Sequence, residues 1–301
     1  IEPSIEDPTD FDAFWNEGRK ELAALPVDAK VTPAPERSLP GAACFHVSLQ
    51  NVPTMPRGTT RNAGPATPSR LYGILCEPVG PGPFPAVLSV PGAGIRSYRG
   101  LAEMAAHRGM ITFQIGIHGI PVYLGTVRAN DFLVAHAKWD KKNLFVMGGS
   151  QGGALSIVNA ALDPRVKALV AYYPALADHT GFRKDRTGGW PFHFRREETR
   201  TAPRLETVPY YDVVNFARRV KIPGLYSWGF NDETCPPTSL YAVYNVIRAP
   251  KHLVLALETG HSTSPEQSEL ADAWLERQWK PKAAVAKKAP AAAAPSPPPA
   301  R

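Results

Sequence analysis

Hydrophobic positions along the chain form short continuous runs, separated by longer segments in which apolar residues return every three or four positions. Ala86–Val90 and Ile111–Ile117 have the length and composition of strands buried on both faces. The intervening spacing is that of amphipathic helices. Strands and helices that alternate in this way predict an α/β fold with a mostly parallel, doubly wound sheet flanked by helices.

The predicted elements extend from residue 10 to residue 279. A helix over residues 10–24 begins after Thr9-Asp10, an N-cap candidate, and places Phe11, Phe14 and Trp15 on one face. The expected strands are Cys44–Leu49, Leu71–Cys76, Ala86–Val90, Ile111–Ile117, Asn143–Met147, Ala168–Tyr172, Gly224–Phe230 and His252–Leu257. The other expected helices are Tyr98–His107, Val127–Ala137, one directly after Ser150, Pro237–Val246 and Pro265–Trp279.

Two segments interrupt the alternation. Residues 174–209 are polar and rich in glycine and aromatic residues, and they are too long for an ordinary connection. They are a candidate lid or pocket wall, although a surface excursion without a binding role fits the same pattern. Residues 280–301 are almost entirely Ala, Pro and Lys, which predicts a disordered tail. We therefore expect one domain over residues 1–279, with an N-terminal helical extension.

Composition and charge narrow the class of protein. Five of the seven net positive charges lie in residues 280–301, so residues 1–279 carry an ordinary charge balance and nucleic-acid binding has little support. No apolar run approaches the roughly 20 residues of a membrane helix. The chain begins at Ile1 rather than Met, so any signal peptide would already be gone and its absence proves nothing.

The three cysteines, Cys44, Cys76 and Cys235, match neither a zinc-site spacing nor an even disulfide framework. One disulfide plus one free thiol remains open. We expect no metal and no cofactor.

Gly148-Gly149-Ser150-Gln151-Gly152-Gly153 lies between an apolar strand and a helix, and matches the nucleophile-elbow pattern G-x-S-x-G. Glycines two residues before and after the serine suit a turn in which any Cβ would collide with the crossing strand or helix. A phosphate-binding loop is the alternative, but no Lys-Ser/Thr pair follows. The pattern therefore predicts Ser150 as a nucleophile, with the N–H of Gln151 directed at an oxyanion.

A nucleophilic serine needs a base and an orienting carboxylate, which follow it in the chain in the order acid, then histidine. Asp232 follows the strand Gly224–Phe230, and His261 follows His252–Leu257. Both therefore lie at the sheet edge from which Ser150 emerges. Asp232 as a helix N-cap and His261 as a surface histidine are the structural alternatives.

Other residues compete for these roles. Glu233 and Glu258 are rival acids, and His118 is the other histidine expected at the catalytic edge. His107 and His252 fit packing roles better. For the second oxyanion donor, the loop Ser89–Gly94 follows a strand at the appropriate place, which makes the N–H of Ala93 the candidate.

Several segments together resemble the acetyl xylan esterase and cephalosporin C deacetylase family of α/β-hydrolases. The matching segments are Pro8–Trp15, Asn143–Val146 with Gly148–Gly153, Asp163–Val166, Asn231-Asp232 with Cys235–Pro237, and Gly260-His261. Glutamine after the serine is the most specific of these features. The resemblance implies an α/β-hydrolase fold, Ser150, Asp232 and His261 as catalytic residues, and removal of small acyl groups, chiefly acetate, from sugar hydroxyls.

The chain also departs from this family. An Arg-Gly-Gln motif of many members is replaced by Ile117–Pro121, and Pro121–Gly125 leads almost directly into the next helix, where members carry a long additional stretch. Ser262 follows the histidine where an acid or tryptophan is common. These departures leave the family's pocket shape and ring-like hexamer open, so homo-oligomer formation stays undecided.

We therefore expect a metal-free serine carboxylesterase that removes acetyl groups from carbohydrate or related alcohols through an acyl-enzyme. A peptidase of the prolyl-oligopeptidase type and a catalytically impaired binding protein are the alternatives; the former normally carries an upstream β-propeller, for which this chain has no segment. The expected partner is a small-molecule or oligosaccharide ester, without nucleic acid or membrane. The family resemblance implies a secreted or periplasmic protein, and a cytoplasmic one stays open.

Overall fold

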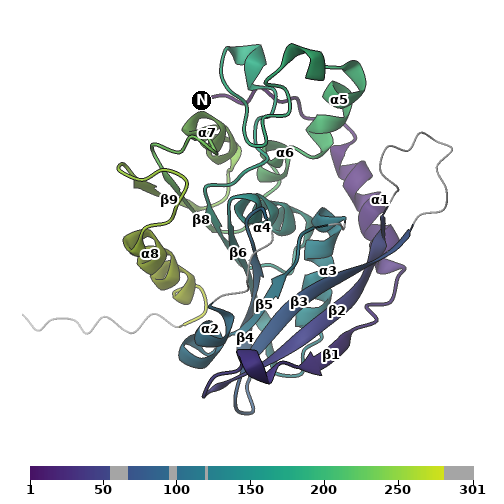
Figure 1. Ribbon diagram of the computed structural model, residues 1–301, viewed down its shortest axis with the longest axis vertical. Coiled ribbons are helices and arrows are strands. Elements are labelled where there is room, and N and C mark those ends of the chain that lie inside the picture. The colour runs from purple at the N-terminus through teal and green to yellow at the C-terminus, as the bar shows by residue number, and fades with distance from the viewer. Residues whose placement is uncertain (55–66, 95–99, 119–120, 281–301) are drawn as a thin grey trace, which may run out of the picture.

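Nine strands form one continuous sheet in the computed structural model, which describes residues 1–54, 67–94, 100–118 and 121–280 (Figure 1). The strands lie in the order β1-β2-β3-β5-β4-β6-β7-β8-β9. Their bounds are β1 Lys30–Pro33, β2 Ala42–Thr54, β3 Thr67–Pro78, β4 Phe84–Val90, β5 Ile111–Ile115, β6 Trp139–Gly149, β7 Ala168–Tyr172, β8 Gly224–Gly229 and β9 Lys251–Ala256.

Helices cover both faces of this sheet. The helices are α1 Phe11–Ala23, α2 Leu101–Arg108, α3 Val122–Val134, α4 Gln151–Leu162, α5 Ala202–Thr207, α6 Val213–Ala217, α7 Pro237–Val246 and α8 Pro265–Glu276. Ala86 and Leu88 of β4 pack in the larger core with α3, α4 and α6, while Val87 between them packs in a second core with α8. Because successive strand residues face opposite sides, the predicted doubly wound α/β fold is confirmed.

The sheet has a parallel part and an antiparallel part. From β5 through β4 to β9 all neighbouring strands are parallel, and β7 and β8 are buried along their whole length. At the other edge β1, β2 and β3 pair antiparallel, and β3 pairs antiparallel with β5. The hydrophobic runs predicted only the centres of β2 and β3, because the residues that extend these strands are mostly polar, alanine or proline, and β1 is exposed throughout.

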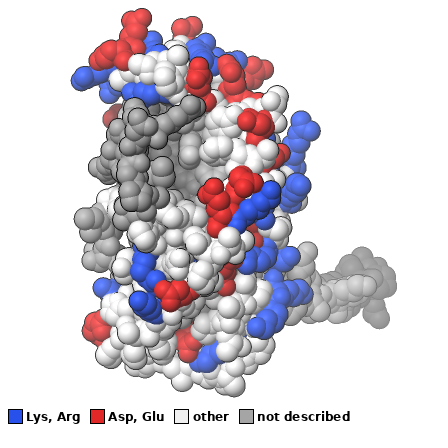
Figure 2. All heavy atoms as spheres, turned by 90° about the vertical axis from the view of Figure 1, so that its right-hand side faces the viewer, with Lys and Arg blue, Asp and Glu red and all other residues white. Residues whose placement is uncertain are grey.

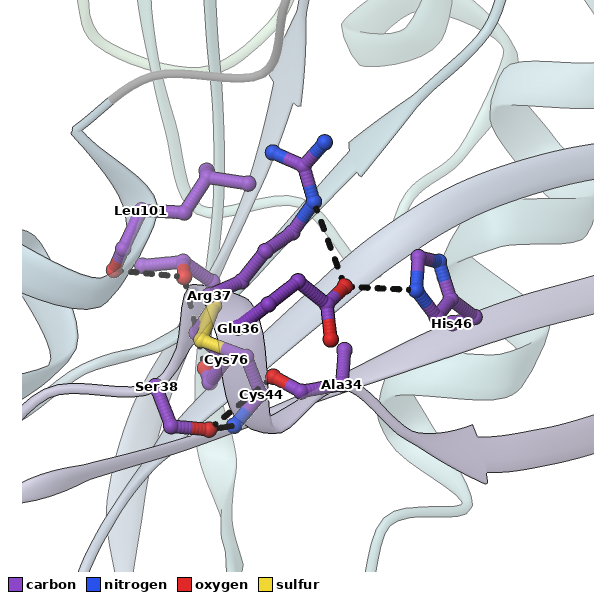
Figure 3. Close-up of a disulfide and its surroundings, with 9 residues drawn as sticks. Ala34, Glu36, Arg37, Ser38, Cys44, His46, Cys76 and Leu101 are labelled. Carbon is purple, nitrogen blue, oxygen red and sulfur yellow. Dashed lines mark hydrogen bonds and ion pairs between the residues drawn. A yellow bond between two sulfur atoms is a disulfide. The ribbon is translucent and has the colours of Figure 1, made fainter.

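A disulfide joins the two long antiparallel strands. Cys44 of β2 and Cys76 of β3 stand directly opposite each other, and both are buried (Figure 3). The hydroxyl of Ser38 accepts the N–H of Cys44 at 3.0 Å and fastens the preceding turn to the same place. Of the alternatives that the sequence left open, one disulfide plus one free thiol is the arrangement observed, since Cys235 is free.

The N-terminal helix α1 packs on the main body, as its aromatic face predicts. Phe11 and Trp15 are buried, and the indole N–H of Trp15 donates to the carbonyl of Tyr210 at 2.9 Å. Arg128 of α3 donates to the carbonyl of Leu22 at 2.6 Å, which satisfies a C-terminal carbonyl of α1. Asp10 stands at the N-cap position but does not cap the helix, because its carboxylate accepts the phenol of Tyr210 instead.

The segment 174–209 forms short helical turns and α5 at one end of the molecule, at the top in Figure 1. Two buried carboxylates hold its base. Asp212 accepts the N–H groups of Asp178 and His179 at 2.9 and 2.8 Å, and Asp178 accepts the hydroxyl of Ser4 at 2.7 Å. Burial raises the pKa of Asp212 to about 7. The segment also lines an open pocket of about 430 Å³ beside His179, Arg186 and Arg200.

The surface carries both signs of charge. On the face seen in Figure 2, Lys and Arg are interspersed with Asp and Glu. Within the described ranges, no helix combines the length and hydrophobicity needed to cross a membrane. Helix α3 begins at Val122 rather than at the predicted Val127, so it follows β5 more closely than the periodicity indicated. The tail predicted over 280–301 lies, from residue 281 on, outside the described residues.

Candidate active site

Ser150 occupies a sharp turn between β6 and α4. Its φ of 59° and ψ of −122° belong to a region that non-glycine residues rarely adopt. A Cβ on Gly148 would lie 2.5 Å from the carbonyl oxygen of Val90, so this position accepts only glycine. The turn therefore has the strained geometry that the G-x-S-x-G pattern predicts, with the serine side chain raised at the end of the strand.

Three side chains that are far apart in the sequence meet at this turn. The His261 imidazole lies between the other two, with Nε2 at 2.9 Å from Ser150 Oγ and Nδ1 at 2.8 Å from Asp232 Oδ2. The Asp232 side chain is completely buried, whereas that of His261 is 25% exposed. Ser150 follows β6, Asp232 follows β8 and His261 follows β9. The carboxyl ends of parallel strands thus bring the three together, as the chain order led us to expect.

Both oxygens of Asp232 are engaged. While Oδ2 faces His261, Oδ1 accepts the N–H groups of Thr234 at 2.9 Å and Cys235 at 2.8 Å. These bonds fold the loop after β8 around the carboxylate. Asp232 is not a helix N-cap, since α7 begins at Pro237 and Pro236 holds the cap position. These two hydrogen bonds fix the rotation of the carboxylate, so its Oδ2 is held toward the imidazole.

The other acids and histidines considered for these roles do not take part in the hydrogen-bonded chain of Asp232, His261 and Ser150. Because both nitrogens of His261 are already bonded, Glu233 and Glu258 share no hydrogen bond with it. His118 is exposed in the loop after β5. His107 and His252 are exposed as well, so the packing role expected for them is wrong, apart from an edge contact of His252 with Trp274. In the part of the chain described here, no three His, Cys, Asp or Glu side chains gather as metal ligands.

Two backbone N–H groups are candidates for the oxyanion. Gln151 is the first residue of α4, where N–H groups have no partner within the helix and the helix dipole favours negative charge. The loop that contains Ala93 passes close to the nucleophile, since a Cβ on Gly92 would lie 3.5 Å from the Cβ of Ser150. This places the loop at the expected side of the serine, and the assignment of Ala93 remains a prediction.

The sequence did not predict that Cys235 and Tyr173 contact the site. Cys235 is buried next to Ser150 and Asp232, and burial raises the pKa of its thiol. Tyr173 follows β7, the strand between those that carry Ser150 and Asp232, and its ring centre lies 4.6 Å from that of His261. The one available signal was the position of Tyr173 at the carboxyl end of a predicted parallel strand.

A family model described as acetyl xylan esterase matches residues 107–277, a range that contains Ser150, Asp232 and His261. The acetyl esterase Axe7A of Xylanibacter ruminicola is 35% identical over 318 aligned residues, which cover 93% of this chain and 69% of that protein.

Solved structures agree with this placement. Acetyl xylan esterase 1 from Thermoanaerobacterium sp. JW/SL YS485 superposes with a TM-score of 0.80 at 22% identity, covering 92% of this chain and 96% of that one. The acetyl xylan esterase from Paenibacillus sp. R4 gives 0.77 at 27% identity, covering 91% and 96%. An acylaminoacyl peptidase of Pyrococcus horikoshii shares the fold alone, at a TM-score of 0.57 and 15% identity over 77% of this chain and 47% of that one.

Proposed function

The chain belongs to the acetyl xylan esterase family, and we propose that Ser150, His261 and Asp232 are the residues with which it removes acetyl groups from carbohydrate esters. The protein is a hydrolase of the carboxylic-ester class. The observation that carries the residue assignment is the unbroken chain of two hydrogen bonds from Asp232 through His261 to Ser150. The order of carboxylate, imidazole and hydroxyl is the one that a serine nucleophile needs, and the carboxylate is buried.

Acylation begins with the hydroxyl of Ser150. As its Oγ attacks the carbonyl carbon of the acetyl ester, Nε2 of His261 takes the hydroxyl proton, and the Asp232 carboxylate stabilises the imidazolium that results. The negative charge that forms on the carbonyl oxygen is held by the N–H groups of Gln151 and Ala93. The imidazolium then returns its proton to the sugar oxygen, which leaves as the alcohol and gives acetyl-Ser150.

Deacylation repeats these steps with water. Nε2 of His261 accepts a proton from a water molecule as the water oxygen attacks the acetyl carbonyl, and the same N–H groups hold the second oxyanion. Collapse of this intermediate expels Ser150 Oγ, which regains its proton from His261, and acetic acid departs and loses its remaining acidic proton to the solvent. No group beyond those named is required to balance the protons.

The disulfide supports a location outside the cytosol. Cys44 and Cys76 form a buried bond between neighbouring strands, and disulfides persist mainly in secreted and periplasmic proteins. We infer that this enzyme acts in such an oxidising compartment, where polysaccharide is also accessible.

The test of the proposed nucleophile is covalent labelling. A fluorophosphonate should modify one residue per chain, and peptide mass spectrometry should place the adduct on Ser150. The rate of acetate release from acetylated xylo-oligosaccharides should fall in proportion to the labelled fraction of the protein. An adduct elsewhere, or full activity in fully labelled protein, would exclude Ser150 as the nucleophile.

A further inference from the structure

The phenol ring of Tyr173 lies against the imidazole of His261, with ring centroids 4.6 Å apart and planes inclined by 56°. Both imidazole nitrogens are bonded, so Tyr173 contacts the ring without competing for either of them. We propose that Tyr173, fastened by Thr263, is a positioning residue that keeps the imidazole aligned between Asp232 and Ser150. This proposal rests on the proposed function of those three residues.

Thr263 forms the hydrogen bond that holds the Tyr173 side chain. Its hydroxyl donates to the phenol oxygen of Tyr173 at 3.1 Å, and it follows His261 by two residues in the same loop. The loop after β9 is therefore tied to the end of β7 at the point where it presents the imidazole. A shift of that loop would have to break this bond or carry Tyr173 with it.

Gly149 makes room for the ring. A Cβ on Gly149 would lie 3.1 Å from the phenol oxygen of Tyr173 and 3.2 Å from two of its ring carbons. The phenol therefore fills the space between the elbow and the imidazole. A side chain at the residue before Ser150 would push the ring toward His261, so the bare backbone of Gly149 and the ring of Tyr173 fit as a pair.

The backbone of Tyr173 is held in an unfavourable conformation. Its φ of +31° is rare for a residue with a Cβ, and its N–H donates to the carbonyl of Ser227 on the neighbouring strand at 2.7 Å. Strain of this kind persists where the surroundings over-determine the conformation, and it concentrates at functional sites. Here the strained residue is the one whose side chain reaches the proposed base.

The alignment has a direct chemical value. A rotation of the imidazole that keeps one nitrogen bonded moves the other away, so a base that serves Asp232 and Ser150 together has one productive orientation. The titratable groups that face this ring are the Asp232 carboxylate and the Tyr173 phenol, with the Cys235 thiol beside Ser150 and Asp232. Burial raises the pKa of the Cys235 thiol and so keeps it uncharged.

The experiment compares Tyr173→Leu, Tyr173→Phe and Thr263→Val, with rates for p-nitrophenyl acetate normalised to the sites that a fluorophosphonate titrates. Tyr173→Leu should lower kcat about 10-fold and leave KM within about twofold. The loss should fall on kcat rather than on KM, because a looser imidazole is less often aligned with both Asp232 and Ser150 while the binding of the ester does not depend on it.

The variant Tyr173→Phe keeps the aromatic ring and removes its hydrogen bond to Thr263, so it separates the effects of the two. Tyr173→Phe should recover most of kcat, and it should match Thr263→Val because each removes the same hydrogen bond. The double variant should then lose no more than either single variant. If Tyr173→Leu fails to fold, this cycle decides the proposal, and additive losses overturn it.

Two further outcomes separate this proposal from the assignment beneath it. A folded Tyr173→Leu protein that the fluorophosphonate labels fully and that keeps the wild-type kcat overturns the positioning role alone. Activity that survives in Ser150→Ala overturns the triad itself, and the proposal with it.

Discussion

Gly152 and the carbonyl of Val90 touch so closely that a Cβ added at Gly152 would lie 1.9 Å from the Val90 oxygen. Helix α4 thus crosses the end of β4 with backbone against backbone, two residues beyond the proposed nucleophile. The contact fixes the angle at which α4 leaves the sheet, and with it the direction of the Gln151 N–H.

Gly152→Ala should therefore cost at least about 3 kcal/mol of unfolding free energy, because neither strand nor helix can retreat within a packed core. Chemical denaturation measures this loss, and residual esterase activity should fall with it. The matched control is Gly18→Ala in α1, where the added Cβ meets only the flexible end of Leu124. That variant should keep wild-type stability or gain slightly, since alanine favours a helix interior. Equal stability of both variants would contradict the close contact.

Ser150→Ala should reduce the turnover of acetyl esters by several orders of magnitude, on the scale that removal of a triad serine costs in other hydrolases. The melting temperature should not fall, since Ser150 is a strained residue and loses only a hydroxyl. Initial rates with p-nitrophenyl acetate and thermal melts of the same preparation give both quantities. A rate near that of the wild type would refute the assignment.

Asp232→Asn should lower kcat by roughly 10⁴-fold, because an amide facing Nδ1 favours the wrong imidazole tautomer. Glu233→Gln and Glu258→Gln are the natural controls, since neither carboxylate bonds His261, and both should stay within a few-fold of the wild type. Steady-state kinetics of the three variants decides which carboxylate orients the base. A larger loss in either control would move the orienting acid to that residue.

Asp212 should make the protein less stable as the pH rises. Its pKa is about 7 in the folded protein and near 3.8 when unfolded, so between these values the folded state binds the extra proton. Stability from this group is complete below about pH 4 and is lost as the pH rises to about 7. His179 acts in the opposite sense, because burial lowers its pKa to about 4 and stability falls as the pH drops below 6.5.

The unfolding free energy of the wild type minus that of Asp212→Asn isolates the contribution of Asp212 to the pH dependence of stability. We expect this difference to decrease by a few kcal/mol between about pH 4 and pH 7. Urea titrations across that range measure it. A difference that is flat or rises with pH would show that Asp212 is ionised throughout.

The Cys44–Cys76 bond should stabilise the fold without affecting the chemistry. The bond closes a loop with a sequence separation of 32, for which a loss of about 3.7 kcal/mol is expected on removal. The double variant Cys44→Ala, Cys76→Ala should melt at lower temperature and keep kcat at 25 °C. A thiol reductant should destabilise the wild type and leave the double variant unchanged. If the reductant affects both equally, the effect does not come from this bond.

How far the sequence predicted the molecule depended on the range of the interactions. Parallel strands such as β7 and β8 are buried throughout and mostly apolar, so their bounds could be read closely. The exposed strand β1 has no hydrophobic pattern because it is defined by its hydrogen bonds to β2. Helix α3 begins early because Val122 and Tyr123 pack on residues remote in sequence, such as Trp15.

The same distinction applies to the site. Ser150 has a local pattern, and the positions of Asp232 and His261 follow from strand order, so residue reasoning could place all three. Tyr173 carried only its place at the end of a predicted strand, and Cys235 only its place in the loop after Asp232. Their contacts with His261 and Ser150 leave no local pattern, because they join side chains from separate loops. The disulfide was one of several open pairings until the register of β2 against β3 set Cys44 opposite Cys76.

The attachment of α1 has a consequence for synthesis of the chain. Helix α3 supplies the first partners of α1, since Arg128 bonds Leu22, but Trp15 also bonds Tyr210 and Ser4 bonds Asp178, so the N-terminal segment is not fully covered until about 200 further residues have been made. At 5–20 residues per second this is roughly 10–40 s on the ribosome. During that interval an aromatic helix face is exposed to other nascent chains. A chaperone that holds this N-terminal segment should therefore raise the yield of folded protein more than one that acts after release.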